Sequence, residues 1–106
     1  MITHTVHVIT KPSEHDRFVA AARALRDASV REEGNIEYSL WAPLEGGSEV
    51  LVVERWRDQA AVEAHQAAGP MAAFRAAVKG AVAVAPTSTR AVDDSGRGPA
   101  AEQGKG

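Results

Sequence analysis

The stretch REEGNIEYSLWAPLEGGSEVLVVERWR, residues 31–57, decides the fold because it holds two strand patterns joined by a turn. Residues 36–42 and 49–57 are rich in β-branched and aromatic side chains, which favour strands. Residues 43–48 between them contain a Gly-Gly pair, a common turn signal. The sequence therefore predicts a β-hairpin in the middle of the chain.

A further strand is predicted over residues 1–10, where β-branched side chains dominate again. Strand alternation places Val6 and Val8 on one face, and His7 and Ile9 on the other. Because both faces carry apolar residues, we expect this strand to be central in the sheet and covered on both sides.

The segment between this strand and the hairpin predicts a helix over residues 14–31. Ser13 is the expected N-cap, and Asp16 three residues later is its capping-box partner. The apolar stripe at helical spacing consists of Phe18, Ala21, Ala22, Leu25, Ala28 and Ser29.

After the hairpin, two short helices and a last strand are predicted. Asp58 is the expected N-cap of a helix through Ala67, Gly69-Pro70 breaks the helical pattern, and a second helix covers residues 71–79. Residues 81–85 are a strand candidate that Pro86 interrupts, with residues 87–92 continuing in extended form.

The domain is expected to span residues 1–92, because the composition changes from Asp93 onward. Residues 93–106 contain almost no apolar side chain except alanine, so they are expected to form a flexible tail.

The order β-α-β-β-α(α)-β predicts the α+β class: a ferredoxin-like split β-α-β domain with an antiparallel four-stranded sheet and helices on one face. The other face also carries apolar side chains and needs a cover. A second copy of the chain can supply it, so we expect a homodimer.

Composition narrows the function classes. The chain has 106 residues, a net charge of −2 and no cysteine, which rules out disulfides and thiolate chemistry. There is no basic stripe for nucleic acid, no signal peptide and no apolar run of membrane-spanning length. We expect a soluble cytoplasmic protein without nucleic-acid or membrane partners. Neither a nucleotide-binding glycine motif nor a metal-ligand spacing occurs.

Four segments together resemble the antibiotic biosynthesis monooxygenase family, most of all its quinol monooxygenase branch. The resemblance covers about residues 2–92 and is specific through the order and spacing of its parts. The segments are Arg31 to Tyr38, Glu54-Arg55-Trp56, Asp58 to His65, and Pro70-Met71 through Phe74 to Gly80.

This resemblance implies a dimeric α+β barrel that oxidises a phenolic substrate, such as a quinol or an anthrone, with molecular oxygen. It implies neither metal nor flavin, since the substrate itself supplies the electrons. The protein would position the substrate, accept a proton and exclude water. Haem degradation is not expected, because His65 stands where those relatives have their tryptophan.

His65 is the candidate catalytic residue, as base or proton relay. It shares a helix face with Ala61 and Val62 and is expected to point toward the sheet. An imidazole suits proton transfer at neutral pH. The structural alternative is a core histidine bonded to a strand backbone or to Glu54.

The candidate substrate-binding residues are Tyr38, Trp56, Asn35, His7, Phe74 and Met71. Each has a structural alternative: Tyr38 and Trp56 as core residues, Asn35 as a turn residue, Phe74 and Met71 as core packing. His7 is expected to line the cavity. Glu54 shares a strand face with Trp56 and has two interpretations: a pocket wall with an orienting carboxylate, or, as we favour, a surface or dimer-contact residue. His4 and His15 are interpreted as surface residues, and Trp41 as a dimer anchor.

Two other function classes stay open from the sequence. One is a non-oxidative small-molecule binder, such as an isomerase or accessory protein of a polyketide-type pathway. The other is an interaction module whose sheet serves only assembly. A cavity large enough for an aromatic bicycle would favour the monooxygenase or the small-molecule binder over the interaction module.

Overall fold

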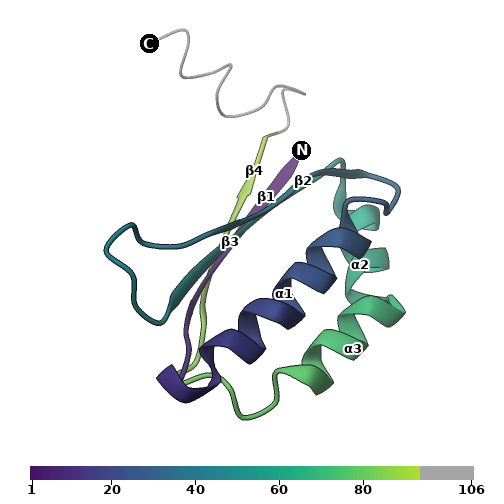
Figure 1. Cartoon of the computed structure of the whole chain (residues 1–106). Coiled ribbons are helices and arrows are strands. Elements are labelled where there is room, and N and C mark those ends of the chain that lie inside the picture. The colour runs from purple at the N-terminus through teal and green to yellow at the C-terminus, as the bar shows by residue number, and fades with distance from the viewer. Residues whose placement is uncertain (94–106) are drawn as a thin grey trace, which may run out of the picture.

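The computed structural model describes residues 1–93, and the predicted tail from residue 94 lies outside the described residues. These residues form four strands and three α-helices, with a short 3-10 turn over Pro12–Glu14 between the first strand and the first helix. Figure 1 shows how these elements are arranged. Their bounds are β1 Ile2–Ile9, α1 His15–Ser29, β2 Asn35–Trp41, β3 Glu49–Trp56, α2 Gln59–Ala67, α3 Gly69–Ala77 and β4 Thr87–Val92.

The four strands form one antiparallel sheet in the order β2-β3-β1-β4, as the ferredoxin-like prediction requires. β1 is central, as expected, between β3 and β4. Paired residues of neighbouring strands project to the same face. The register therefore aligns one polar row across the sheet, composed of Tyr38, Glu54, His4 and Arg90.

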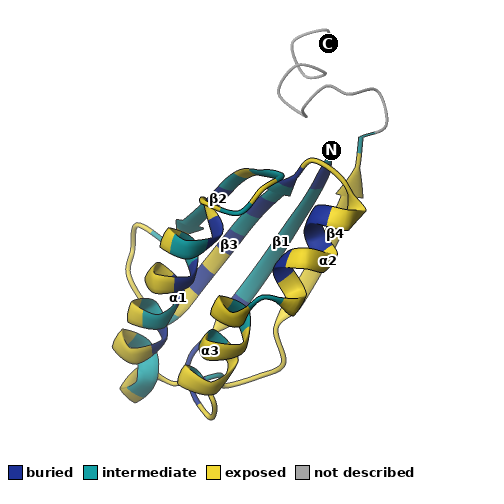
Figure 2. Cartoon of the chain, turned by 90° about the vertical axis from the view of Figure 1, so that its right-hand side faces the viewer, coloured by how far each residue is buried: buried dark blue, intermediate teal, exposed yellow. Residues whose placement is uncertain are grey.

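All three helices cover one face of the sheet, and the other face carries no helix (Figure 1). The predicted stripe on α1 buries Phe18, Ala22, Leu25 and Ser29. Even-numbered residues of β3 pack beneath it, while the intervening residues face away. Figure 2 shows the resulting pattern, with buried segments on the inner sides of helices and strands. The core thus lies in the single layer between helices and sheet.

The predicted N-cap of α1 is wrong, although the helix begins within one residue of its predicted start. Pro12, in the first turn, opens the 3-10 turn, which ends at Glu14, and α1 begins only at His15. Neither Ser13 nor Asp16 makes a capping hydrogen bond, because Ser13 already lies inside this turn. The fixed φ of proline suits the first residues of a helical turn and moves the boundary.

Near the C-terminus, one helix start and one strand need correction. The predicted break between the two helices is present, with extended backbone at Ala68. However, α3 begins at Gly69 and not at residue 71, and Pro70 lies in its first turn, where a proline loses no helical hydrogen bond. Residues 81–85 form no strand and contribute only the isolated bridge between Val82 and Thr10. The edge strand is Thr87–Val92, and Asp93 still bonds to Met1.

Gly34 controls how closely the turn before β2 approaches α2. Its φ is +84°, a conformation that other residues rarely adopt, and a Cβ built there would lie 2.6 Å from the Cβ of Ala61. Its carbonyl accepts a hydrogen bond from the Arg57 N–H at 2.7 Å. This close approach brings the turn that contains Glu32 against the helix that contains His65.

None of the helices within residues 1–93 has the length and apolar character needed to cross a membrane.

Candidate functional site

A cavity of about 180 Å³ lies between the sheet and the helices, as predicted. Tyr38 and Glu54 are the two residues with polar side chains that line it. The rest of the lining is apolar and comes from β1, α1, β3, α3 and the segment before β4: Val6, Val8, Phe18, Ala22, Leu25, Val52, Met71, Phe74, Val78, Val82 and Pro86. An apolar chamber with a few convergent polar groups is the usual form of a small-molecule site.

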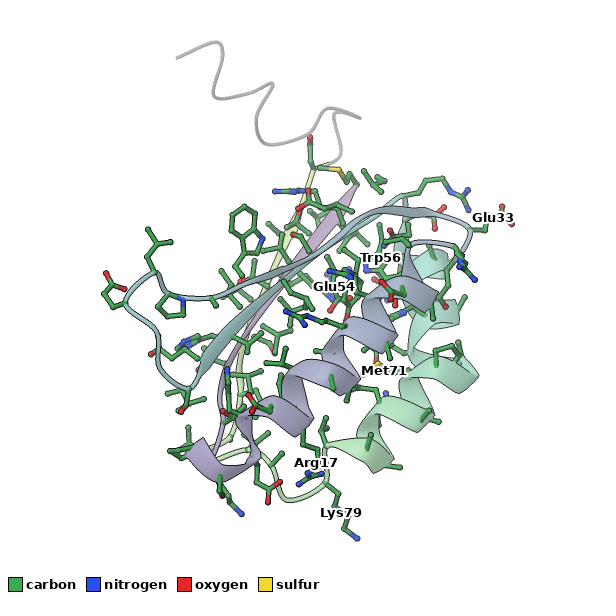
Figure 3. The ribbon with its side chains drawn as sticks, in the orientation of Figure 1. Arg17, Glu33, Glu54, Trp56, Met71 and Lys79 are labelled. Atoms are coloured by element: carbon green, nitrogen blue, oxygen red, sulfur yellow. The ribbon has the colours of Figure 1, made fainter. Side chains whose placement is uncertain are left out.

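Glu54 is held by the indole of Trp56 (Figure 3). The two side chains project from β3 to the same face, and the Trp56 Nε1–H donates to Glu54 Oε1 at 3.1 Å. Trp56 is fully buried and Glu54 is 6% exposed. Trp56 itself does not line the cavity, so its contribution is to orient the carboxylate that does.

His65 lies behind Glu54 in the interior, 2% exposed. Its Nδ1 is 2.7 Å from Glu32 Oε1, and its Nε2 is 3.7 Å from Glu54 Oε1. The imidazole packs against the Trp56 ring at a centroid distance of 4.6 Å. The helix position thus points inward as predicted, but His65 is not a lining residue of the cavity.

The contact with Glu32 decides the tautomer of His65. A carboxylate accepts hydrogen bonds, so at 2.7 Å Nδ1 carries the hydrogen and donates it to Glu32. Nε2 of the neutral ring then has a free lone pair, and it is buried without a hydrogen-bond partner among the described residues. The arrangement can therefore hold a further proton at Nε2, between two carboxylates.

The Tyr38 hydroxyl is kept protonated by its surroundings. Burial raises the pKa of Tyr38 well above its ordinary value, and the negative charges of Glu54 and Glu32 raise it further. Its ring centroid is 5.9 Å from that of His65. Tyr38 can therefore donate a hydrogen bond to an oxygen in the cavity at any physiological pH.

The remaining predicted binding residues divide between two places. Met71 and Phe74 of α3 line the cavity. Asn35 does not: its side-chain amide donates to the Glu37 carbonyl at 3.1 Å, where β2 has a register irregularity. That geometry matches the structural alternative for Asn35.

The predicted location of His7 is wrong. Its ring lies on the sheet face that the helices leave uncovered, 3.7 Å from Glu49, in a separate shallow pocket with Trp41 and Leu51. The reason is strand alternation: Val6 and Val8 occupy the cavity face of β1, so the residue between them points away.

Sequence reasoning misjudged or missed three polar residues near the cavity. Glu54 is buried and lines the cavity, which matches the pocket-wall alternative and not the favoured surface or dimer-contact interpretation. Glu32, from the turn before β2, was not singled out. His4 was interpreted as a surface residue, yet its Nε2 is buried without a hydrogen-bond partner within residues 1–93. The alternation of β3 held the signal for Glu54, since it lies between Val52 and Trp56 on the inner face.

In residues 1–93, no group of three or more histidine, cysteine or acidic side chains is arranged so that it could hold a metal ion. The chemistry available from the described side chains is proton transfer: a carboxylate at the cavity, an imidazole behind it, a second carboxylate behind the imidazole, and a phenol that donates.

Comparisons with known proteins agree with the fold. YcnE of Bacillus subtilis (strain 168), a provisionally named monooxygenase, is 31% identical over 65 residues, which cover 61% of this chain and 68% of that protein. Among solved structures, a Nitrosomonas europaea protein provisionally named an antibiotic biosynthesis monooxygenase superposes with a TM-score of 0.84 at 18% identity, covering 89% of this chain and 99% of the other.

Two further solved structures are similar at comparable levels. Rv0793 from Mycobacterium tuberculosis gives a TM-score of 0.81 at 20% identity and covers 87% of this chain and 93% of its own. PA3566 from Pseudomonas aeruginosa gives 0.80 at 22% identity, with coverages of 87% and 92%. Residues 1–78 match the family model described as antibiotic biosynthesis monooxygenase. The chain therefore belongs to the antibiotic biosynthesis monooxygenase family.

Proposed function

We propose that this protein is a cofactor-independent monooxygenase that oxidises a quinol- or anthrone-type phenolic molecule with O2. The observation that carries the proposal is the cavity itself: an apolar chamber whose polar lining is one carboxylate and one protonated tyrosine. Such a chamber suits a flat aromatic ring with a single acidic hydroxyl group. Membership of the family supports the same reaction type.

The reaction balances without an added reductant. Loss of the phenolic proton makes the ring electron-rich, and it passes an electron to O2. The resulting radical pair combines at a ring carbon, which then loses its hydrogen as the O–O bond breaks. One oxygen atom stays in the product as a new hydroxyl or carbonyl group, and the other leaves as water. The substrate supplies all the electrons, and no other electron donor is needed.

Each side chain of the site has a proposed part in this reaction. Tyr38 donates a hydrogen bond that holds the substrate oxygen. His65 belongs to the machinery that takes up the phenolic proton, as base or relay. Trp56 fixes the carboxylate of Glu54, and the apolar side chains of α1 and α3, among them Met71 and Phe74, keep water from the radical intermediates.

The cavity volume favours small substrates. At about 180 Å³ it is below the range of roughly 300–1,000 Å³ usual for ligand pockets. Engineered cavities of about 150 Å³ hold a benzene ring. A quinol of one or two rings therefore fits the volume better than a three-ring anthrone.

We also propose a homodimer that covers the helix-free face of the sheet. That face exposes Ile9, Leu51 and, at 58% exposure, Trp41. A row of large apolar side chains on an uncovered sheet is typical of an interface. A second copy, related by a two-fold axis, would bury the same residues from both subunits.

Oxygen consumption tests the proposed reaction. The full chain, treated with a chelator, is given one- and two-ring quinols in an oxygen electrode, beside His65→Gln and the control His15→Gln. His15 is a suitable control because it bonds to Thr10 and does not line the cavity. We expect uptake that survives chelation and falls in His65→Gln alone. Absence of uptake across the panel, with quinols still binding, would favour the non-oxidative binder.

A further inference from the structure

We propose that Glu54 is the catalytic residue that takes the phenolic proton, and that His65 and Glu32 are positioning residues forming a relay behind it. This inference rests on the proposed function, and it changes which group touches the substrate. The sequence drew attention to His65, whereas the geometry points to the glutamate two residues before the end of β3.

The first argument is access to the cavity. Glu54 is the carboxylate that lines it, whereas His65 is absent from the lining and only 2% exposed. A base must come within hydrogen-bond distance of the proton that it removes. A ligand filling the cavity meets the Glu54 carboxylate first, and the imidazole lies on the far side of that carboxylate.

The second argument is how the two oxygens of Glu54 are used. Oε1 accepts from Trp56 Nε1–H at 3.1 Å and lies 3.7 Å from His65 Nε2. Oε2 makes no hydrogen bond to the rest of residues 1–93. Burying an ionised carboxylate without full hydrogen bonding is costly. An amide would satisfy the Trp56 donor equally well, so the indole contact alone does not account for a carboxylate here.

The third argument is the direction of the relay. Because Nδ1–H of His65 donates to Glu32, its Nε2 is an acceptor aimed at Glu54 and has no hydrogen-bond partner among the described residues. A protonated Glu54 can pass its proton to this nitrogen over a short movement. The imidazolium then lies between the two carboxylates, which stabilise its charge.

The proton balance is simple. The substrate O–H bond breaks as a Glu54 O–H bond forms, leaving a phenolate and a neutral carboxylic acid. That O–H bond then breaks as an N–H bond forms at His65 Nε2, which restores the Glu54 carboxylate. No electrons move in either step. The charged and titratable groups around this path are Glu32 from the turn before β2, Tyr38 from β2 and His4 from β1, which is paired with Glu54 in the sheet register.

The test uses proton transfer from a ligand without any oxidation. 4-Nitrophenol is a phenol of acidity close to that of imidazole, and its ionised form absorbs visible light. The full chain is titrated with it under nitrogen slightly below neutral pH. Calorimetry measures binding. A rapid upward pH jump, followed in the visible band, then measures how fast the bound ligand loses its proton. The variants are Glu54→Gln and His65→Gln, with Glu33→Gln as control, since Glu33 is an exposed neighbour of Glu32 far from the cavity lining.

We expect 4-nitrophenol to bind all four proteins, and each is saturated with it before the pH jump. The rate at which the bound ligand loses its proton should fall about tenfold or more in Glu54→Gln and in His65→Gln, and should stay unchanged in Glu33→Gln. If Glu54 acted only as a fixed negative charge, its removal would raise the phenolate fraction and would not slow the ionisation.

Two results would overturn the inference while leaving the proposed function standing: a bound ligand that stays neutral in the parent protein after the pH jump, and an ionisation in Glu54→Gln that is as fast as or faster than in the parent protein. Failure of every protein to bind 4-nitrophenol, despite circular dichroism of a folded domain, would instead refute the phenolic site itself and the inference with it.

Discussion

The Gly34→Ala substitution should be among the most damaging single-methyl changes in the molecule. The residue has a φ of +84°, and left-handed backbone costs a residue with a Cβ about 1–2 kcal/mol. The new methyl would also lie 2.6 Å from the Cβ of Ala61, far inside ordinary contact, and overpacking of this kind costs about 1–3 kcal/mol. Together these terms predict a loss of about 2–5 kcal/mol in the free energy of unfolding.

The matched control is Gly46→Ala in the hairpin turn. Gly46 has a similar φ of +81°, but a Cβ there would meet nothing within 4 Å. It should therefore show the backbone cost alone. Urea denaturation at a fixed protein concentration measures both variants, and thermal unfolding should show a loss of at least about 8 °C for Gly34→Ala.

A double-mutant cycle isolates the steric part. Adding Ala61→Gly to Gly34→Ala removes the overlapping methyl, so the two substitutions should be less damaging together than the sum of their separate effects, by about 1 kcal/mol or more. If Gly34→Ala costs no more than Gly46→Ala, or the two substitutions are simply additive, the claim that this turn and α2 are in tight steric contact is wrong.

Three other outcomes follow from the structure. Tyr38 is the sole tyrosine, so ultraviolet absorbance reports its ionisation directly, and the midpoint should lie well above the ordinary pKa of about 10 and move lower in Glu54→Gln. The stability of the fold should fall as pH rises above about 10, because only the unfolded chain then loses this proton. A midpoint near 10 would contradict the argument that burial raises the pKa of Tyr38. Asp58→Ala should lower stability in urea denaturation, since the carboxylate caps α2 by accepting from the Ala61 N–H at 2.9 Å. This hydrogen bond, with the neighbouring Arg57, lowers the pKa of Asp58, so its contribution is present above the ordinary carboxyl pKa and is lost as pH falls through the lowered pKa. An equal loss of stability at very low pH would argue against this cap. Trp41→Ser should weaken self-association measured by analytical ultracentrifugation without changing the fold, and an unchanged sedimentation profile would remove Trp41 from the proposed interface.

The sequence predicted the order of elements because hydrophobic periodicity and turn residues act locally. β2, β3 and α2 begin and end within one residue of their expected bounds. Two errors at helix starts concern proline. Pro12 and Pro70 each lie in the first turn of a helical segment, whereas the predictions placed both helix starts after the proline.

The site was less predictable, because it depends on which face a residue occupies and on which distant residues meet. Strand alternation places Glu54 on the buried face of β3. Because glutamate is rarely buried, the sequence analysis favoured an exposed position for it despite this alternation. Its pairing with His65 and Glu32 needs three elements from separate parts of the chain. No local pattern encodes that meeting, whereas the inward direction of His65 follows from helical spacing alone.

The central place of β1 has a consequence for how the chain comes together during synthesis. Of the four strands, β1 leaves the ribosome first, and both of its sheet neighbours, β3 and β4, come much later in the sequence. Until they arrive, its apolar side chains and unpaired backbone groups have no partner in the sheet, whereas β2 and β3 can pair as a hairpin as soon as both exist. Nascent chains interrupted after β3 would still lack one edge of that strand's pairing. The domain is therefore most exposed to aggregation before β3 is complete, when β1 has neither neighbour, and this is where a chaperone would have most to protect.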